Sequence, residues 1–142
     1  MFGAPVVKGH SNDISVPLET LPKDSISSIA FNRQGEGESQ GKLLAAGSWD
    51  STVRLWSVNQ AGHGGFGAAG LATAAGCLKE KRPVLCTDFR PTDNAVLFGG
   101  LDKTVKAWRP EWGEDARVSV ASHTQPVSEV KWLDHHGGLV VR

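Results

Sequence analysis

Cysteine is scarce in this sequence of 142 residues. The two cysteines, Cys77 and Cys86, do not form a Cys-x-x-Cys pair, which argues against both a zinc site and a disulfide framework. Two packed thiols in a reducing compartment are the simpler interpretation.

An excess of one charge and a long apolar run are also missing. Fifteen basic residues balance fifteen acidic ones, so no overall field draws the protein to nucleic acid or to a membrane surface. The most apolar run, Ala68 to Leu78, is mostly glycine and alanine and is too short to span a bilayer. The N-terminus shows no basic start followed by an apolar segment. We therefore expect a soluble intracellular protein without membrane insertion.

The sequence lacks catalytic and metal-binding patterns as well. It holds no Gly-x-Ser-x-Gly element and no Cys/His arrangement of the kind that activates a nucleophile. The histidines have no ligand spacing with cysteine or acidic residues; they are His10, His63, His123, His135 and His136. The sequence thus predicts no enzyme, no metal, no cofactor and no small-molecule substrate.

One glycine pattern keeps a nucleotide-binding enzyme open as an alternative. Residues 65–70 match Gly-x-Gly-x-x-Gly, and Asp88 follows 18 residues later, as in a dinucleotide-binding unit. However, the preceding strand is expected to end near Val58, too early for a tight turn into the glycines, and Gly76 interrupts the segment that would form the helix. A flexible Gly/Ala linker over residues 61–76 is the better interpretation.

An internal repeat organises the chain. Residues 47–56 (GSWDSTVRLW) match residues 99–108 (GGLDKTVKAW) at an offset of 52, where Asp, Thr, Val, a basic residue and Trp coincide. A second motif precedes each of these, because residues 26–31 match residues 84–89 and the motif returns at 127–132. Repeats of this kind indicate a modular fold.

The repeat spacing is that of a propeller blade. Phe89 and Trp132 are 43 residues apart, within the roughly 40–45 residues of a four-stranded blade. Phe31 and Phe89 are 58 residues apart, and the extra 15 fall in two connections, a polar turn at 35–41 and the Gly/Ala stretch. Because added length in a connection costs little, the repeat survives both insertions.

The predicted secondary structure is all-β. Short, partly alternating segments bounded by turn residues predict strands, and no window shows a helical stripe. The predicted strands are 26–31, 43–47, 53–56, 84–89, 95–98, 105–108, 118–121, 127–132 and 138–141. The predicted units are 1–22, an N-terminal segment with a closing strand; 23–58, repeat one; 59–82, a Gly/Ala-rich insertion and connection; 83–122, repeat two; and 123–142, a partial repeat three.

Each full repeat carries the same candidate structural positions. A turn Asp can accept backbone N–H bonds, a turn Thr does so more weakly, and the Trp that ends the repeat offers a large face for packing between sheets. These positions are Asp50, Thr52, Trp56, Asp102, Thr104 and Trp108. Since Asp50 and Asp102 are equivalent under the repeat, they belong to successive blades and do not form a catalytic carboxylate pair.

Two groups of basic residues are candidate contacts for RNA phosphates. They are Lys79, Lys81 and Arg82, interrupted by Glu80, and Lys103, Lys106 and Arg109. A solvated charged face is the alternative interpretation of both.

The ordered series of motifs resembles WD40 propellers. In the detailed sequence of its motifs it resembles one subfamily, the mRNA-export nucleoporins of the nuclear pore, together with their spindle-checkpoint relatives. The resembling segments run over nearly the whole chain: 12–16, 23–31, 47–50, 83–87, 99–104 and 123–132.

The resemblance implies a WD40 β-propeller of seven blades, of which this chain supplies about two and a half. It implies that residues 14–16 complete the last blade. It also implies a His before the first strand of a blade, bonded to the turn Asp; this residue is present only as His123, with Glu80 in its place one blade earlier and the matching Asp beyond Arg142. Because an open arc leaves a strand edge and an apolar face uncovered, we expect these residues alone to be a fragment, poorly soluble or unstable.

The resemblance further implies a non-enzymatic scaffold. Its implied role is that of a nuclear-pore-associated mRNA export adaptor, which binds a nucleoporin peptide segment and contacts mRNA or mRNP indirectly. The implied localisation is the nucleus and the nuclear pore or envelope, with cytoplasmic shuttling. A spindle-checkpoint adaptor at kinetochores is the alternative within the same propeller family.

Overall fold

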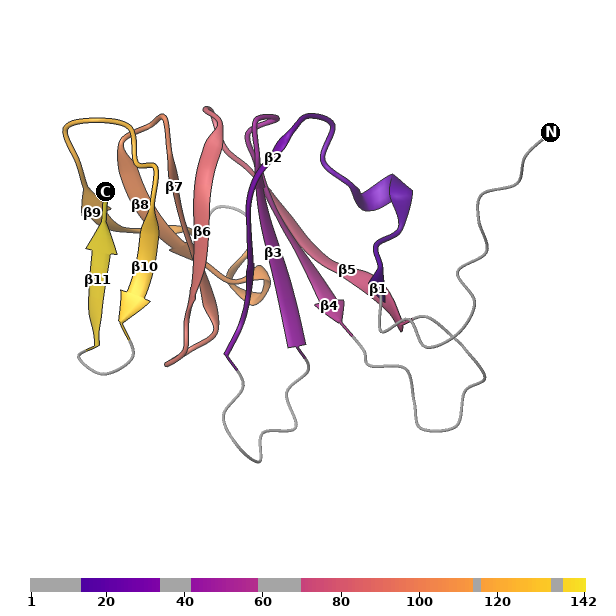
Figure 1. Cartoon of the computed structure of the whole chain (residues 1–142). Coiled ribbons are helices and arrows are strands. Elements are labelled where there is room, and N and C mark those ends of the chain that lie inside the picture. The colour runs from indigo at the N-terminus through magenta and orange to yellow at the C-terminus, as the bar shows by residue number, and fades with distance from the viewer. Residues whose placement is uncertain (1–13, 34–41, 59–69, 114–115, 134–136) are drawn as a thin grey trace.

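The computed structural model describes residues 14–33, 42–58, 70–113, 116–133 and 137–142. Within them the chain forms three sheets that stand side by side in chain order, as Figure 1 shows. The two short helical elements, η1 (Leu18–Thr20) and η2 (Pro110–Trp112), are single 3₁₀ turns. Neither is long and apolar enough to cross a membrane, and the described ranges contain no other helix. The all-β prediction is confirmed.

The first sheet, called blade 1, is an antiparallel meander. Its strands are β2 (Ile26–Phe31), β3 (Lys42–Ser48), β4 (Thr52–Val58) and β5 (Gly70–Lys79), each hydrogen-bonded to the next. A short strand β1 (Ile14–Ser15) adds to the free edge of β5 in parallel. The resemblance implied that this segment completes the last blade; in the structure it pairs instead with the open outer edge of the first.

The second sheet, called blade 2, repeats the meander. Its strands are β6 (Val84–Arg90), β7 (Ala95–Gly100), β8 (Thr104–Trp108) and β9 (Val118–Ser122). A hairpin of β10 (Val130–Leu133) and β11 (Gly138–Val141) begins the third blade. All nine strands predicted from the sequence are present in the structure as β2–β4 and β6–β11, with ends shifted by up to a few residues.

One prediction about secondary structure is wrong. Residues 70–76 were expected to belong to a flexible linker, yet they lie in β5, the outer strand of blade 1. The reason is tertiary: β5 pairs with β4 along seven positions, from Thr52 with Lys79 to Val58 with Ala72. Backbone pairing of this kind compensates for the weak strand preference of glycine and alanine. The rest of the Gly-x-Gly-x-x-Gly pattern, the polar turn at 35–41, and His10, His63, His135 and His136 lie outside the described residues.

The blades pack face to face through apolar side chains. Val53, Leu55 and Leu78 of blade 1 share a buried cluster with residues of blade 2. The blade 2 members of this cluster are Val84, Phe89, Val96, Phe98 and Trp108. A second cluster joins blade 2 to the hairpin through residues such as Val127 and Val130. Burial of these β-branched and aromatic side chains is the main force that stacks the sheets.

The inner strands are also joined by polar contacts. The Ser28 Oγ on β2 lies 2.9 Å from Thr87 Oγ1 on β6 and accepts a 3.1 Å bond from the Thr87 N–H. The Trp132 N–H on β10 donates across to the Asp88 carboxylate on β6 at 2.7 Å. These bonds join β2 to β6 and β6 to β10, in addition to the apolar contacts between the sheets.

Candidate interaction face

The Asp50 side chain organises the turn between β3 and β4. It accepts bonds from the Thr52 N–H at 2.9 Å, from the Thr52 hydroxyl, and from the Lys23 N–H at 2.9 Å. The last of these ties the segment before β2 to the turn, so one carboxylate holds two loops together. Ser51, between Asp50 and Thr52, has φ of 69°, a left-handed conformation that suits a tight turn.

These contacts lower the pKa of Asp50. Partial burial acts to raise the pKa, but the bonds from Thr52 and from the Lys23 N–H favour the charged carboxylate and outweigh it. Asp50 is therefore an anionic acceptor inside its own turn, where its oxygens meet backbone and hydroxyl donors and the Arg54 guanidinium at 3.8 Å.

The equivalent turn of blade 2 places Lys106 beside its carboxylate, at the position that Arg54 occupies beside Asp50 in blade 1. Asp102 accepts a 3.1 Å bond from the Thr104 N–H and pairs with Lys106 Nζ at 2.9 Å. Burial acts to raise the pKa of Asp102, but the Lys106 ammonium and the Thr104 N–H lower it overall. Burial likewise acts to lower the pKa of Lys106, and its carboxylate partners Asp102 and Glu80 raise it overall. Both groups are thus held in their charged forms.

Trp56 and Trp108 are each 2% exposed. Trp108 packs into the cluster between blades 1 and 2, whereas Trp56 lies with Ala46 and Val58 in a separate cluster. The indole N–H of Trp56 donates to Thr20 Oγ1 and that of Trp108 to the Gly113 carbonyl, both at 2.9 Å.

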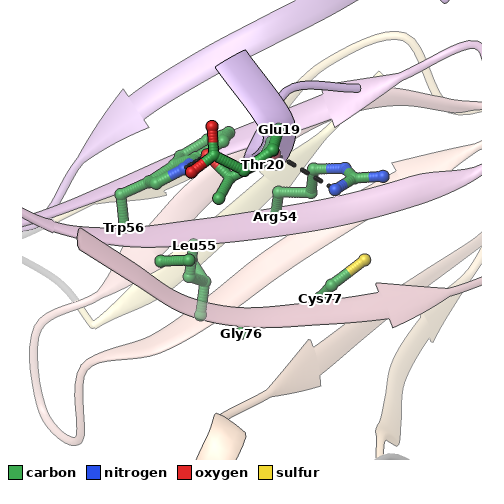
Figure 2. Close-up of a pocket in the computed structure, with 8 residues that line it drawn as sticks. Glu19, Thr20, Arg54, Leu55, Trp56, Gly76 and Cys77 are labelled. Atoms are coloured by element: carbon green, nitrogen blue, oxygen red, sulfur yellow. Dashed lines mark hydrogen bonds between the residues drawn. The ribbon is translucent and has the colours of Figure 1, made fainter. Parts of the chain in front are cut away.

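A pocket of about 280 Å³ lies beside Trp56, between η1, β4 and β5 (Figure 2). Arg54 crosses it to donate to the Thr20 carbonyl at 3.1 Å. Cys77, half-buried, lines the same pocket. Since the arginine and the Trp56 indole are both used to fasten η1 to the blade, the pocket anchors the N-terminal segment and offers few spare polar groups to a ligand.

The position four residues before the repeated motif, which begins at Ile26, Val84 and Val127, differs between the three blades. It is Pro22 in blade 1, Glu80 in blade 2 and His123 in the third blade. His123 is exposed, and its backbone N–H donates to the Lys103 carbonyl at 2.8 Å. The side-chain bond that the resemblance implied for His123 stays a prediction.

Glu80 joins the two blades. Its N–H donates to the Ser51 carbonyl at 2.7 Å. Its two carboxylate oxygens pair with Lys106 at 3.1 Å and with Arg117 at 2.6 Å, and its side chain is 7% exposed. Arg117 also donates to the Lys79 carbonyl at 2.8 Å. An acidic residue thus occupies the repeat position where the resemblance places a histidine.

A basic groove of about 440 Å³ surrounds Glu80. The structure brings the predicted cluster Lys79, Lys81 and Arg82 to one wall of it, all three exposed. Lys106 and Arg117 line it as well. Of the second predicted group, only Lys106 lies in the groove; Arg109 pairs with Glu111 at 2.7 Å instead.

Sequence reasoning did not single out Trp49 as a candidate contact. It lies in the turn next to Asp50 and is 47% exposed, while its N–H donates to the Ser25 carbonyl at 3.0 Å. The repeat offered the signal: the equivalent position in blade 2 is Leu101, so the turn itself does not require a tryptophan. An exposed tryptophan on an ordered loop is typical of a protein-binding surface.

The described part of the chain gathers no three His, Cys, Asp or Glu side chains in a way that could hold a metal ion. Burial raises the pKa of the Cys86 thiol to about 11, which keeps it protonated and unreactive.

Comparison with known proteins supports the repeat. The family model "WD domain, G-beta repeat" matches residues 15–57. The chain is 35% identical over 127 residues to "Protein Rae1" of Drosophila melanogaster, covering 89% of the chain and 32% of that protein. It is 33% identical over 108 residues to "Protein RAE1" of Arabidopsis thaliana, covering 75% of the chain and 28% of that protein.

Two further comparisons agree. The chain is 28% identical over 133 residues to the "mRNA export factor" of Bos taurus, covering 94% of the chain and 33% of that protein. Among solved structures, the WD40 β-propeller domain of Doa1 matches with a TM-score of 0.58 at 19% identity, covering 84% of the chain and 34% of that structure. The chain thus spans about a third of the length of these curated relatives.

The fold prediction is confirmed by these matches and by the blade topology. At 19% identity the solved propeller informs the fold alone. The sequence relatives extend over most of the chain, across both complete blades. The chain is a WD40-repeat β-propeller segment, homologous to the proteins named Rae1 and mRNA export factor.

Proposed function

We propose that the chain is part of a WD-repeat mRNA export factor, a non-enzymatic scaffold that acts in the nucleus and at the nuclear pore and shuttles to the cytoplasm. The observation that carries this proposal is the similarity to Rae1 and mRNA export factor sequences over 75–94% of the chain. The structure supplies what a scaffold needs, because buried apolar clusters hold its sheets together. Its mechanism is the presentation of loops to a partner.

The partner in this proposal is a peptide segment of a nucleoporin. Trp49 is the side chain best placed to anchor such a segment because it is large, half-exposed and set in a turn that Asp50 holds by three bonds. A rigid aromatic anchor contributes strongly to peptide binding since little conformational freedom is lost when the partner docks.

A binding experiment tests this part of the proposal. The full-length protein is captured on an immobilised nucleoporin segment, and Trp49→Ala is expected to weaken capture at least ten-fold, the usual effect of removing an interface hot spot. Phe31→Ala is the matched control. Phe31 is a 45% exposed aromatic residue at the end of β2 that lies away from the Trp49 turn. Equal loss in both variants, or no loss in Trp49→Ala, would reject the assignment of this face.

The same assay separates the export role from the checkpoint role. Binding to the nucleoporin segment in preference to the equivalent segment of the checkpoint kinase supports an export adaptor, and the reverse preference supports the kinetochore alternative. In cells, depletion of the protein is expected to retain polyadenylated RNA in the nucleus. Failure of the wild-type protein to restore export would contradict the proposal.

Direct contact with RNA is a separate part of the proposal. It is supported by the exposed side chains of Lys79, Lys81 and Arg82, which line one wall of the groove. Cations grouped along a connection suit a phosphodiester backbone, which binds largely through charge. A double change, Lys81→Ala with Arg82→Ala, is expected to weaken binding of a single-stranded RNA and to reduce its salt dependence. Unchanged binding would exclude this wall as the contact.

A further inference from the structure

The basic groove contains a buried carboxylate, Glu80, which lies between two cations that could otherwise bind a phosphate. Glu80 lies between Lys106 and Arg117, within 3.1 Å of the first and 2.6 Å of the second. The Glu80 side chain is 7% exposed, whereas Lys106 and Arg117 are 22% and 28% exposed. The two cations therefore reach solvent in the groove, with the carboxylate behind them.

The charges around Glu80 are unequal. Five basic and two acidic side chains line the groove, so a net positive charge remains after every ion pair is formed. Asp102 shares Lys106 with Glu80, which leaves Glu80 as the acidic partner of Arg117. Outside these pairs, Lys79, Lys81 and Arg82 line the wall as exposed cations.

A carboxylate and a phosphate bind the same hydrogen-bond donors of lysine and arginine. Both present acceptor oxygens to the guanidinium fork and to the ammonium group. Glu80 thus occupies two of the donors that an incoming phosphate would use. An ion pair formed in advance competes with the ligand, because binding must then exchange one anion for another.

We propose that this groove takes a phosphate group of a single-stranded RNA and that Glu80 is a built-in counter-ion that limits the affinity. The proposal rests on the RNA contact proposed above and assigns its regulation to one residue. The adjacent exposed cations of the wall favour a chain of phosphates over a single one, since each can meet a successive phosphate of the same strand. Arg117 and Lys106 then become RNA ligands once Glu80 is displaced or neutralised.

The test measures binding of a fluorescent single-stranded oligouridylate to the full-length protein by anisotropy over a range of salt concentrations. Glu80→Gln keeps the size and hydrogen-bonding ability of the side chain but removes its charge. We expect it to bind about three- to ten-fold more tightly than the wild type and to steepen the salt slope by roughly 0.7, the increment for one additional phosphate contact on a single strand.

Glu111→Gln is the matched control. It removes the same charge from an ion-paired glutamate that lies on η2, outside the groove, and is expected to change affinity less than two-fold. Arg117→Gln is the second variant, because it keeps Glu80 in place and removes a proposed RNA ligand. It is expected to weaken binding, and this readout stands even if Glu80→Gln folds poorly.

The outcomes distinguish the two proposals. Tighter binding by Glu80→Gln alone supports the counter-ion role, and so does binding by Glu80→Gln when the wild type shows none. If the double variant at Lys81 and Arg82 weakens RNA binding while Glu80→Gln and Arg117→Gln do not alter it, the counter-ion role is overturned and the RNA contact stands. If neither the wild type nor Glu80→Gln binds RNA, both proposals are overturned.

Discussion

Blades 1 and 2 approach closely at Gly47, because glycine has no side chain. A Cβ added to Gly47 on β3 would lie 2.7 Å from Val84 Cγ1 and 3.2 Å from Thr87 Cγ2 on β6. Since the first distance is well inside van der Waals contact, Gly47→Ala must push the blades apart or force Val84 out of its rotamer. Overpacking of this kind costs about 1–3 kcal/mol, of which roughly 0.5–1 kcal/mol is returned because alanine suits a strand better than glycine.

We therefore expect Gly47→Ala to lower the free energy of unfolding by about 1–2 kcal/mol. Val84→Ala removes methyl groups from a side chain that is 2% exposed, and we expect it to cost about 2–3 kcal/mol through lost burial and the cavity left behind. In the double variant the new Cβ fills space that Val84 has vacated. The combined cost should then be smaller than the sum of the single costs by at least about 1 kcal/mol.

Urea unfolding of the four proteins, followed by tryptophan fluorescence, measures these differences. Gly138→Ala is the control, because a Cβ added there meets no atom within 4 Å, and its effect should stay within about 0.5 kcal/mol. Costs of Gly47→Ala and Val84→Ala that add to within about 0.5 kcal/mol would refute the reasoning. Gly99, whose added Cβ would lie 2.8 Å from Val127 Cγ1, offers an independent repetition of the experiment between blade 2 and the hairpin.

Three further predictions concern single groups. Lys103 has φ of 67°, so Lys103→Gly should raise the free energy of unfolding by about 0.5–1 kcal/mol and Lys103→Val should lower it; the opposite order in urea unfolding would contradict this. Folding lowers the pKa values of Asp50 and Asp102 below 3.8, so the stability that they contribute is present above about pH 4 and is lost as the pH falls through the folded values. Asp50→Asn should flatten the acid limb of the stability–pH curve, and an unchanged curve would show that Asp50 does not contribute to it. Because the pKa of Cys86 is about 11, a thiol reagent at pH 8 should leave Cys86 unmodified in the native protein and label it only on unfolding; rapid native labelling at Cys86, mapped by mass spectrometry, would show that the thiol is accessible.

The repeat made most of the fold predictable. Strands such as β4 and β8 carry a local pattern that is repeated at an offset of 52 residues, so each copy supports the assignment of the other. Strand β5 carries no such pattern, because its central residues are glycine, alanine and threonine. The residues of β5 are determined by tertiary packing, as Gly76 shows. A Cβ on Gly76 would lie 3.0 Å from Pro110 and 3.1 Å from Trp108. Small residues are needed at this contact, and only the folded chain reveals it.

The groove was predictable only in part. Lys79, Lys81 and Arg82 are neighbours in sequence, so their clustering was visible from the start. Lys106 and Arg117 reach Glu80 from 26 and 37 residues away. No local signal connects such residues, because their proximity depends on how β5 of one blade meets β8 and β9 of the next. Sequence reasoning found Lys79, Lys81, Arg82, Lys106 and the interrupting Glu80, but it did not predict the ion pairs that join Glu80 to Lys106 and Arg117.

The blades satisfy their turn carboxylates in different ways. In blade 1 Asp50 accepts from the backbone N–H of Lys23 at 2.9 Å, and the Arg54 guanidinium lies 3.8 Å from the same carboxylate. In blade 2 Asp102 pairs with the Lys106 ammonium at 2.9 Å, which Glu80 holds from the other side. The turn thus requires a donor but not a histidine, which explains how the blades keep their geometry with Pro22 and Glu80 at the position of His123. Lys106 lies closer to Asp102, at 2.9 Å, than Arg54 lies to Asp50, at 3.8 Å. Because salt screens charge pairs, we expect the turn of blade 2 to depend on ionic strength more than the turn of blade 1 does, and a phosphate that draws Lys106 away from Asp102 would loosen the same turn.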